Sequence, residues 1–220
     1  MVGSAILRNL QKQGYSNFIF RTSAELDLRN QQAVADFFAK EMPEYVFLAA
    51  AKVGGIAANV AAPVDFLVEN LKIQNNIILA CRAYDVVKTI FLGSSCIYPR
   101  ECQQPIREDY FMTGPLEPTN ESYAVSKIAG IRLAQALHYQ AGMNIICPMP
   151  CNVYGVGDHF EFERSHVLSA FVRRLVEAKR NNNSVVTLWG SGSARREFLH
   201  VDDLADALLF LMYNYASPDI

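Results

Sequence analysis

The chain has 220 residues, of which 51% are hydrophobic and 19% are charged, and its formal net charge is −2. This length and composition predict a globular protein with one large domain, or with one domain and part of another. A charge so close to neutral excludes the concentrated Lys and Arg of a nucleic-acid or anionic-lipid binder.

Short β-rich runs alternate with helical patterns along the whole chain. In chain order they predict a helix over 1–14, a strand over 17–21, a helix over 30–41, a strand over 45–51, a helix over 62–84, a strand over 89–95, a helix over 121–141, a strand over 144–150, a helix over 166–180, a strand over 185–189 and a helix over 201–215. The strands are nearly continuous apolar runs, as in a parallel sheet that helices cover on both faces. We therefore predict an α/β fold with a doubly wound parallel sheet of Rossmann type.

The predicted order begins with a helix, whereas a doubly wound sheet begins with a strand. In dinucleotide-binding proteins that strand is followed by a Gly-rich turn whose N–H groups bind the pyrophosphate. Residues 1–5, MVGSA, look like the end of such a turn with Gly3 as its last glycine, although one glycine before a helix is also a common start signal. We expect a sheet that lacks its first strand.

The chain has no predicted membrane span and no secretion signal. Its apolar runs are far shorter than the roughly 20 residues that cross a bilayer, and residues 1–15 lack the apolar core of a signal peptide. The five cysteines are odd in number and show neither a CxxC pattern nor metal-type spacing to histidine. These features predict a cytoplasmic protein with reduced thiols and without a metal site.

The strongest chemical pattern joins Ser94, at the end of a predicted strand, with SYAVSK, where Tyr123 and Lys127 lie four residues apart on one helix face. An ammonium group beside a phenol is expected to lower the phenol pKa from about 10, which suits proton exchange with a substrate oxygen. A hydroxyl at the carboxyl end of the strand would bind that same oxygen. The spacing alone is weak, because Tyr84 and Lys88 repeat it without a serine partner.

Five segments give the chain a family resemblance. They are, in order, LAAAKVGGI, FLGSSCIYP, EPTNESYAVSKIAG, PCNVYG and WGSGSARREFLHVDD. Over essentially its whole length the chain resembles the extended short-chain dehydrogenases/reductases, and among them it is similar to enzymes that epimerise and then reduce a GDP-linked 4-keto-6-deoxy sugar. SYAVSK and REFLHVDD are shared by many nucleotide-sugar enzymes, whereas AAAKVGGI and GSSCIYP are more particular to this group. The resemblance implies an NADP-dependent oxidoreductase and isomerase that acts on a GDP-sugar.

Epimerisation of a 4-keto sugar needs a base on one face and an acid on the other, because the C–H bonds on both sides of the carbonyl are acidic. The resemblance assigns these tasks to Cys96 and His166, with Cys96 as the base, and completes the catalytic set with Ser94, Tyr123 and Lys127. Cys96 comes two residues after Ser94, which in an extended segment points both side chains to one side. Without the resemblance, Cys96 reads as a small buried hydrophobe and His166 as a capping or core residue.

The second predicted strand indicates the type of cofactor. An acidic residue at its end would bind the ribose 2′-hydroxyl of NAD, whereas an arginine suits the 2′-phosphate of NADP. FIFRTSAELDL offers Arg21 and no acid at the strand end, which favours NADP(H), although Ser23 stands where the family often has a second arginine. By resemblance, the cofactor-binding residues are Gly3, Arg21, Leu28, Leu92, Gly93, Ser94, Ser95, Tyr123, Lys127, Pro150, Cys151, Asn152, Val153 and His166.

The resemblance places the GDP half of the substrate on Arg174, Trp189 and Arg196. Guanidinium groups suit diphosphate oxygens, and an indole face suits the sugar-nucleotide cleft. The alternative is that Arg174 lies on a solvated helix face and that Trp189 belongs to the core. We assign residues 1–155 to an incomplete NADP-binding Rossmann domain that carries the catalytic residues. Residues 156–220 would begin the nucleotide-sugar-binding region and return a helix to the Rossmann domain.

Two other functions compete with epimerisation and reduction. One is a nucleotide-sugar 4-reductase or 4,6-dehydratase of the same family, and the other is a shortened, non-catalytic relative that acts as a binding partner. Because the predicted sheet lacks a central strand, we expect the 220-residue chain by itself to bind NADPH poorly and to turn over little. The resemblance also implies a homodimer formed through the helices over 62–84 and 121–141, of which the first is apolar around its circumference.

Overall fold

The structure is a computed structural model that describes residues 1–161, 165–188 and 190–219. Its helices are α1 Val2–Lys12, α2 Gln31–Glu41, α3 Ile56–Ala61, α4 Pro63–Ala83, α5 Glu121–Ala141, α6 Val167–Arg180 and α7 Val201–Asn214. Its strands are β1 Tyr45–Leu48, β2 Lys88–Phe91, β3 Ile145–Ile146, β4 Asn152–Tyr154 and β5 Phe198–His200. Three 3₁₀ helices are η1 Ser95–Ile97, η2 Glu108–Tyr110 and η3 Pro118–Asn120. Within these described ranges, no helix combines the length and the apolar character needed to cross a membrane.

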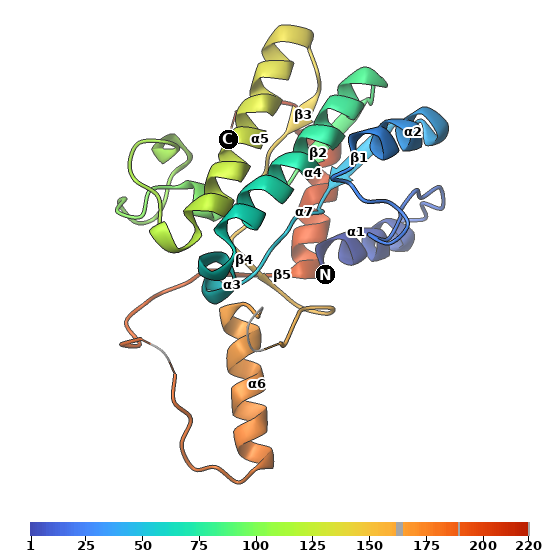
Figure 1. Cartoon of the computed structure of the whole chain (residues 1–220). Coiled ribbons are helices and arrows are strands. Elements are labelled where there is room, and N and C mark those ends of the chain that lie inside the picture. The colour runs from blue at the N-terminus through green and yellow to red at the C-terminus, as the bar shows by residue number, and fades with distance from the viewer. Residues whose placement is uncertain (162–164, 189, 220) are drawn as a thin grey trace.

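The main sheet is parallel and has the strand order β1, β2, β3. Neighbouring residues of β2 point to opposite faces, so that Phe91 packs with residues of α2, α4 and α5, whereas Ile90 packs with residues of α1 and α7. Figure 1 shows α4 and α5 side by side in front of the sheet and α1 close to α7. Helices therefore cover both faces, and the predicted α/β fold with a doubly wound parallel sheet is confirmed.

The central strand β2 is buried along its whole length, as its apolar run predicts. A glycine lets α5 approach it closely, since a Cβ at Gly130 would lie 2.6 Å from the ring of Phe91. A buried hydrogen bond joins α5 to α4, where Gln74 Nε2 donates to the carbonyl oxygen of Ser126 over 2.6 Å. These contacts fix the helix of the SYAVSK motif against the middle of the sheet.

Two strand predictions are wrong. Residues 17–21 form no strand, and Phe20 among them is 64% exposed. Extended backbone needs a neighbour for its N–H and C=O groups, and within the described structure β1 pairs with β2 alone. Residues 185–188 also form no strand, while Trp189, the end of that prediction, lies outside the described residues.

The sequence analysis missed a second, two-stranded parallel sheet made of β4 and β5. Val153 pairs with Leu199, and Tyr154 pairs with His200. Each strand has three residues, too few to give a recognisable period. His200 also caps the following helix, because its Nδ1 accepts the backbone N–H of Asp202 over 3.3 Å.

Helix α6 projects away from the main sheet, and the chain after it returns to β5 through a long irregular segment (Figure 1). Ser169 and Ala178 are the buried residues among its 14. A hydrogen bond ties the helix to the returning segment, where Arg174 donates to the carbonyl oxygen of Thr187 over 3.2 Å. This part of the molecule therefore has much less core than the sheet and its covering helices.

Candidate active site

The predicted site residues after β2 and β3 lie side by side at the carboxyl ends of these strands. The N–H of Gly93 donates to the carbonyl oxygen of Pro148 over 3.0 Å, and the N–H of Ser95 donates to Pro150 over 3.3 Å. A Cβ at Gly93 would lie 2.1 Å from the sulfur of Met149, so a larger residue here would displace the Met149 side chain. Ligands of open parallel sheets bind at this edge.

Ser94 and Tyr123 meet at this edge, as the motif spacing predicts. The Ser94 hydroxyl oxygen accepts the backbone N–H of Cys96 over 3.3 Å, and the Ser94 side chain hydrogen bonds with the Tyr123 phenol. The Tyr123 ring lies edge-on to Phe66 of α4, with 6.5 Å between the ring centroids. The serine hydroxyl and the phenol are therefore held together at one point, where they can share one substrate oxygen.

The expected lowering of the phenol pKa is wrong for this structure. Burial raises the pKa of Tyr123 well above its ordinary value of 10, the charge of the Cys96 thiolate raises it further, and the Ser94 hydrogen bond lowers it. Removal of water from the phenolate is the largest of these influences. Tyr123 is thus fully protonated at neutral pH and fits a proton donor.

Lys127 lies one helical turn after Tyr123, with its Nζ 5.8 Å from the centre of the tyrosine ring. Its ammonium donates to the carbonyl oxygen of Leu92 over 2.8 Å and lies 4.7 Å from the centre of the Phe91 ring. Burial lowers the Lys127 pKa to about 8, although the Cys147 thiolate opposes this change. The amine therefore titrates near neutral pH.

Cys96 lies in η1, a 3₁₀ helix, and not in the extended segment that the sequence analysis assumed. It is half-buried, and its charge raises the pKa of the Tyr123 phenol, so the thiol lies near the phenol. Its sulfur accepts a hydrogen bond from Asn120 Nδ2 over 3.2 Å. A thiol with a polar partner differs from the inert, apolar cysteine of the structural alternative.

Asn120 is a site residue that the sequence analysis missed. It ends η3 and immediately precedes α5. The one local signal was its place before the SYAVSK helix, which predicts no more than a helix cap. Among the described residues its Oδ1 is buried without a hydrogen-bond partner. Such a carbonyl oxygen costs about 1–3 kcal/mol unless a ligand or water satisfies it.

His166 is the N-cap residue of α6, as the sequence analysis predicts for a helix start. Its side chain makes no capping hydrogen bond and is half-buried, so the structure does not support the capping alternative. The neighbouring Ser165 lies against the LAAAKVGGI segment, since its carbonyl oxygen would be 3.0 Å from a Cβ at Gly55. Helix α3 follows Gly55 and contacts η3, the 3₁₀ helix that ends at Asn120.

The remaining predicted cofactor residues fall into two groups. At the sheet edge, Asn152 and Val153 belong to β4, with Cys151 just before them. Towards the amino-terminal half, Arg21 forms an ion pair with Glu41 over 2.7 Å, and Leu28 packs against the core next to α2 and α4. Gly3 lies in the first turn of α1, where a Cβ would meet no atom within 4 Å.

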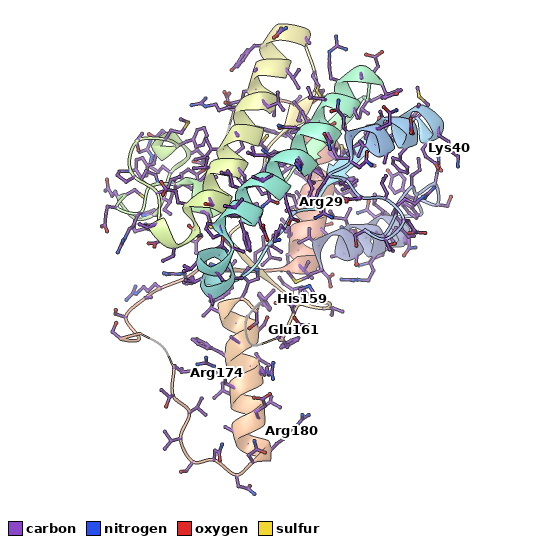
Figure 2. All side chains as sticks on the ribbon, viewed as in Figure 1. Arg29, Lys40, His159, Glu161, Arg174 and Arg180 are labelled. Atoms are coloured by element: carbon purple, nitrogen blue, oxygen red, sulfur yellow. The ribbon has the colours of Figure 1, made fainter. Side chains whose placement is uncertain are left out.

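Two of the predicted GDP-binding residues lie in described parts of the chain, one on α6 and one in the segment before β5. Arg174 lies on α6, where it borders a surface hollow of about 370 Å³ formed with the segment 183–187. Arg196 lies in the exposed segment before β5 and donates to the carbonyl oxygen of Arg195. Trp189 lies outside the described residues. Figure 2 shows Arg174 and Arg180 on the projecting helix, away from the sheet.

All five cysteines are free thiols. Over the ranges that the structure describes, no three His, Cys, Asp or Glu side chains are grouped to hold a metal ion.

A family model described as the NAD dependent epimerase/dehydratase family matches residues 1–220. The chain is 57% identical over 216 residues to the putative GDP-L-fucose synthase 2 of Arabidopsis thaliana, and this match covers 98% of the chain and 66% of the relative. Over the first curated relatives, the chain thus spans about two thirds of their length.

Two solved structures are similar to this chain over nearly all of its residues. A GDP-mannoheptose C4 reductase from Campylobacter jejuni with NADP bound is 40% identical, with a TM-score of 0.88 over 97% of this chain and 72% of that one. A GDP-L-fucose synthetase from Naegleria fowleri bound to NADP is 31% identical, with a TM-score of 0.88 over 99% of this chain and 71% of that one. The predicted membership of the short-chain dehydrogenase/reductase type agrees with all four of these matches.

Proposed function

Because this chain belongs to the NAD dependent epimerase/dehydratase family, we propose that it catalyses steps from GDP-4-keto-6-deoxy-D-mannose to GDP-L-fucose, first 3,5-epimerisation and then reduction of the 4-keto group. The observation that carries the proposal is the convergence of the Ser94 hydroxyl, the Tyr123 phenol and the Cys96 thiol at one sheet edge. The 57% identity to a putative GDP-L-fucose synthase supports this choice of substrate.

In the epimerisation steps, Cys96 would act as the base and His166 as the acid. The Cys96 thiolate removes a proton beside the sugar carbonyl, and the resulting enolate oxygen is held by the Ser94 hydroxyl and the Tyr123 phenol. His166 then returns a proton to the opposite face of the same carbon. Cys96 then releases its proton to solvent and His166 takes one up, and repetition at the second carbon completes the inversion of C3 and C5.

In the reduction step, Tyr123 would donate its proton to the 4-keto oxygen. Burial raises the pKa of this phenol, so the proton is present at neutral pH, and Ser94 hydrogen bonds both to the phenol and to the sugar oxygen. The charged Lys127, on the next turn of α5, stabilises the phenolate that remains. The transfer therefore leaves a sugar hydroxyl at C4 and a phenolate beside an ammonium group.

NADP(H) fits the residues around this site, and when bound it would supply the hydride for C4. Tyr123 and Lys127 would hold its nicotinamide ribose. At the other end, α1 begins without a side-chain cap and has open space at Gly3, which suits a pyrophosphate. Arg21 is paired with Glu41, so a 2′-phosphate would share or replace this ion pair.

We further propose that residues 1–155 form the unit that binds the cofactor and carries the catalytic residues, and that residues 156–220 begin the unit that binds the GDP-sugar. In the second unit, the residues that contact the GDP-sugar would be Arg174, Trp189 and Arg196. Two chains would pair through α4 and α5, which lie side by side (Figure 1). Apolar side chains on these helices, Val64 and Val68 of α4 and Val125 of α5, are exposed by 70%, 39% and 41%. Pairing would remove them from water.

A second candidate is 4-keto reduction without epimerisation. The 40% identity to a GDP-mannoheptose C4 reductase favours it, because the Ser94, Tyr123 and Lys127 group would serve either enzyme. The thiol at Cys96 and the histidine at position 166 distinguish the first candidate from the second.

The test is to incubate the chain, at a concentration close to that of the substrate, with GDP-4-keto-6-deoxy-D-mannose and NADPH, and to identify the products by NMR. We expect GDP-L-fucose, and we expect solvent deuterium at C3 and C5 in D2O. The Cys96→Ser variant should lose most of this deuterium incorporation. A reduced sugar that keeps the configuration of C3 and C5 would favour the second candidate, and no product from a folded, NADPH-saturated chain would reject both.

A further inference from the structure

The side chain of Asn120 does not cap helix α5, although the residue is at the N-cap position. Asparagine immediately before a helix usually accepts a backbone N–H of the first turn with its Oδ1. Here Asn120 makes no such side-chain bond to α5. Instead its Nδ2 donates to the sulfur of Cys96 over 3.2 Å. Helix capping therefore does not explain the direction of this amide.

The backbone of Asn120 is held firmly in that place. Its N–H donates to the carbonyl oxygen of Glu117 over 3.2 Å, and the Glu117 carboxylate accepts the N–H and the hydroxyl of Thr119 over 3.2 and 2.9 Å. Tyr123 follows one turn later on α5. The turn thus places the amide of Asn120 between the SYAVSK helix and the segment that carries Cys96.

We propose that Asn120 is a positioning residue for the Cys96 base: its amide N–H holds the sulfur beside Tyr123 and stabilises the thiolate. The inference rests on the function proposed above, in which Cys96 removes a proton from the sugar. A hydrogen bond to an ionised acceptor is about twice as strong as a bond between neutral groups. The bond therefore favours the form of Cys96 that acts as a base.

Two other ionisable side chains lie close to this pair. The Tyr123 phenol lies near enough for the Cys96 charge to raise its pKa, and burial keeps that pKa well above its ordinary value of 10. The carboxyl group of Glu117 has a lowered pKa because it accepts hydrogen bonds from Thr119. Tyr123 thus stays protonated and Glu117 stays ionised between pH 7 and pH 10, whereas the Lys127 amine, with a pKa of about 8, loses its proton in this range in every variant.

The test measures how fast iodoacetamide alkylates Cys96, with each cysteine followed by mass spectrometry of its own peptide and without substrate or cofactor. Loss of the donor in Asn120→Ala should slow alkylation of Cys96 several-fold at pH 7. Asn120→Asp keeps the shape and the capping ability of asparagine and adds a negative charge, so it should slow the reaction about tenfold. At pH 10 the Asn120→Ala rate should match that of the unsubstituted chain.

Three controls separate this effect from a change in folding. Cys102 and Cys151, which are half-buried like Cys96, should react at unchanged rates in every variant. Asn214→Asp, at the end of α7, makes the same charge change at a remote site and should leave Cys96 unaffected. Circular dichroism reports whether each variant retains its helices at both pH values.

Rates within twofold of the unsubstituted chain at pH 7 in both Asn120 variants would overturn the inference. So would a difference that persists at pH 10, because it would mean that access to the sulfur had changed and not the thiolate. The alkylation needs neither sugar nor cofactor, so its outcome is independent of the product assay. A chain that makes no GDP-L-fucose but shows the alkylation effect would refute the proposed function alone.

Discussion

Two Tyr-x-x-x-Lys pairs lie at opposite ends of the same strand, and the chain uses them for different purposes. Lys88 is the first residue of β2, while Lys127 donates to Leu92 just after the strand. Both lysines are buried, with 5% and 3% of their surface exposed, and both donate to backbone carbonyl groups. The difference between them lies in what surrounds each ammonium group.

Lys88 completes the end of a helix. Its Nζ donates to the carbonyl oxygens of Leu211, Met212 and Tyr215 over 2.8, 2.6 and 2.5 Å at the C-terminus of α7, where the Leu211 oxygen also accepts the N–H of Tyr215 over 3.2 Å. Its partner in the motif, Tyr84, packs against Phe38. The pair therefore links β2 to α7 and contributes stability.

Lys127 instead lies beneath a phenol that bonds to a serine and faces a thiol. The same spacing of residue types thus gives a structural pair at the amino end of the strand and a reactive group at its carboxyl end. A sequence motif of this kind is informative only with the third residue, Ser94, and with the strand end that carries it. Three measurements test this division of roles.

The largest expected difference is between the reaction rates of two variants that each lose one phenol oxygen, Tyr123→Phe and Tyr84→Phe. Tyr123→Phe should reduce formation of the 4-reduced sugar at least about 100-fold, because the proton donor is lost. Tyr84→Phe, the matched control, should leave the rate within twofold. Both variants should unfold in urea within about 1 kcal/mol of the unsubstituted chain. A large loss of rate in the Tyr84 variant would remove the distinction between the pairs.

For stability we expect the opposite order: replacing Lys88 should lower the free energy of unfolding more than replacing Lys127. Lys88→Met should lower the free energy of unfolding by about 2–3 kcal/mol, since it leaves three carbonyl groups at the end of α7 without their charged donor. Lys127→Met loses one such bond and also removes a buried charge, so its free energy should change by about 1 kcal/mol or less. Urea unfolding of both variants at pH 7 measures the two changes, and equal losses would contradict the comparison.

The smallest expected effect is the contribution of Lys127 to the pH dependence of the free energy of unfolding. Burial lowers the Lys127 pKa to about 8, compared with 10.5 for an ordinary lysine. Between these values the unfolded chain binds a proton that the folded chain does not, so Lys127 makes the folded state more stable as pH rises from 8 to 10.5. Relative to Lys127→Met, the unsubstituted chain should therefore gain at least about 1 kcal/mol between pH 7 and pH 10.

The contribution of Lys88 cancels in this difference, because both proteins carry it. Its pKa is also lowered by burial, so its own contribution has the same sign. Urea titrations of both proteins at the two pH values measure how much the free energy of unfolding changes with pH in each protein. The difference between the two changes is the contribution of Lys127. No gain, or a gain of the opposite sign, would mean that the Lys127 amine is not desolvated in the folded protein.

The predictability of the fold depended on how far each element relies on its neighbours. The helix predicted over 121–141 has those bounds in the structure, because its pattern and its terminal Gly142 are local signals. The strand predicted over 17–21 failed, although its residues favour strands, because no described neighbour pairs with it. The three-residue strand β4 was missed for the converse reason, since its pairing with β5 gives it order that its sequence does not show.

The residues of the site fall into the same two groups, those that local sequence signals predict and those that only packing between distant segments reveals. The spacing of Tyr123 and Lys127 and the position of Ser94 were recognisable because a motif and a strand end define them. Asn120 was not recognisable, since its contact with Cys96 spans 24 residues and arises from the packing of η3 beside η1. The direction of the Tyr123 pKa shift was also predicted wrongly, because sequence spacing reveals the ammonium but not the burial that opposes it.

By itself, the sequence determined that a parallel α/β sheet forms and that a phenol and an amine share one face of the helix after it. Apolar runs and four-residue spacing act over short stretches of chain, so they can be read without coordinates. The tertiary structure alone decided how strongly Tyr123 and Lys127 are desolvated, and which asparagine reached the thiol. Those outcomes depend on desolvation and on contacts between distant segments, and neither exists until the chain has packed.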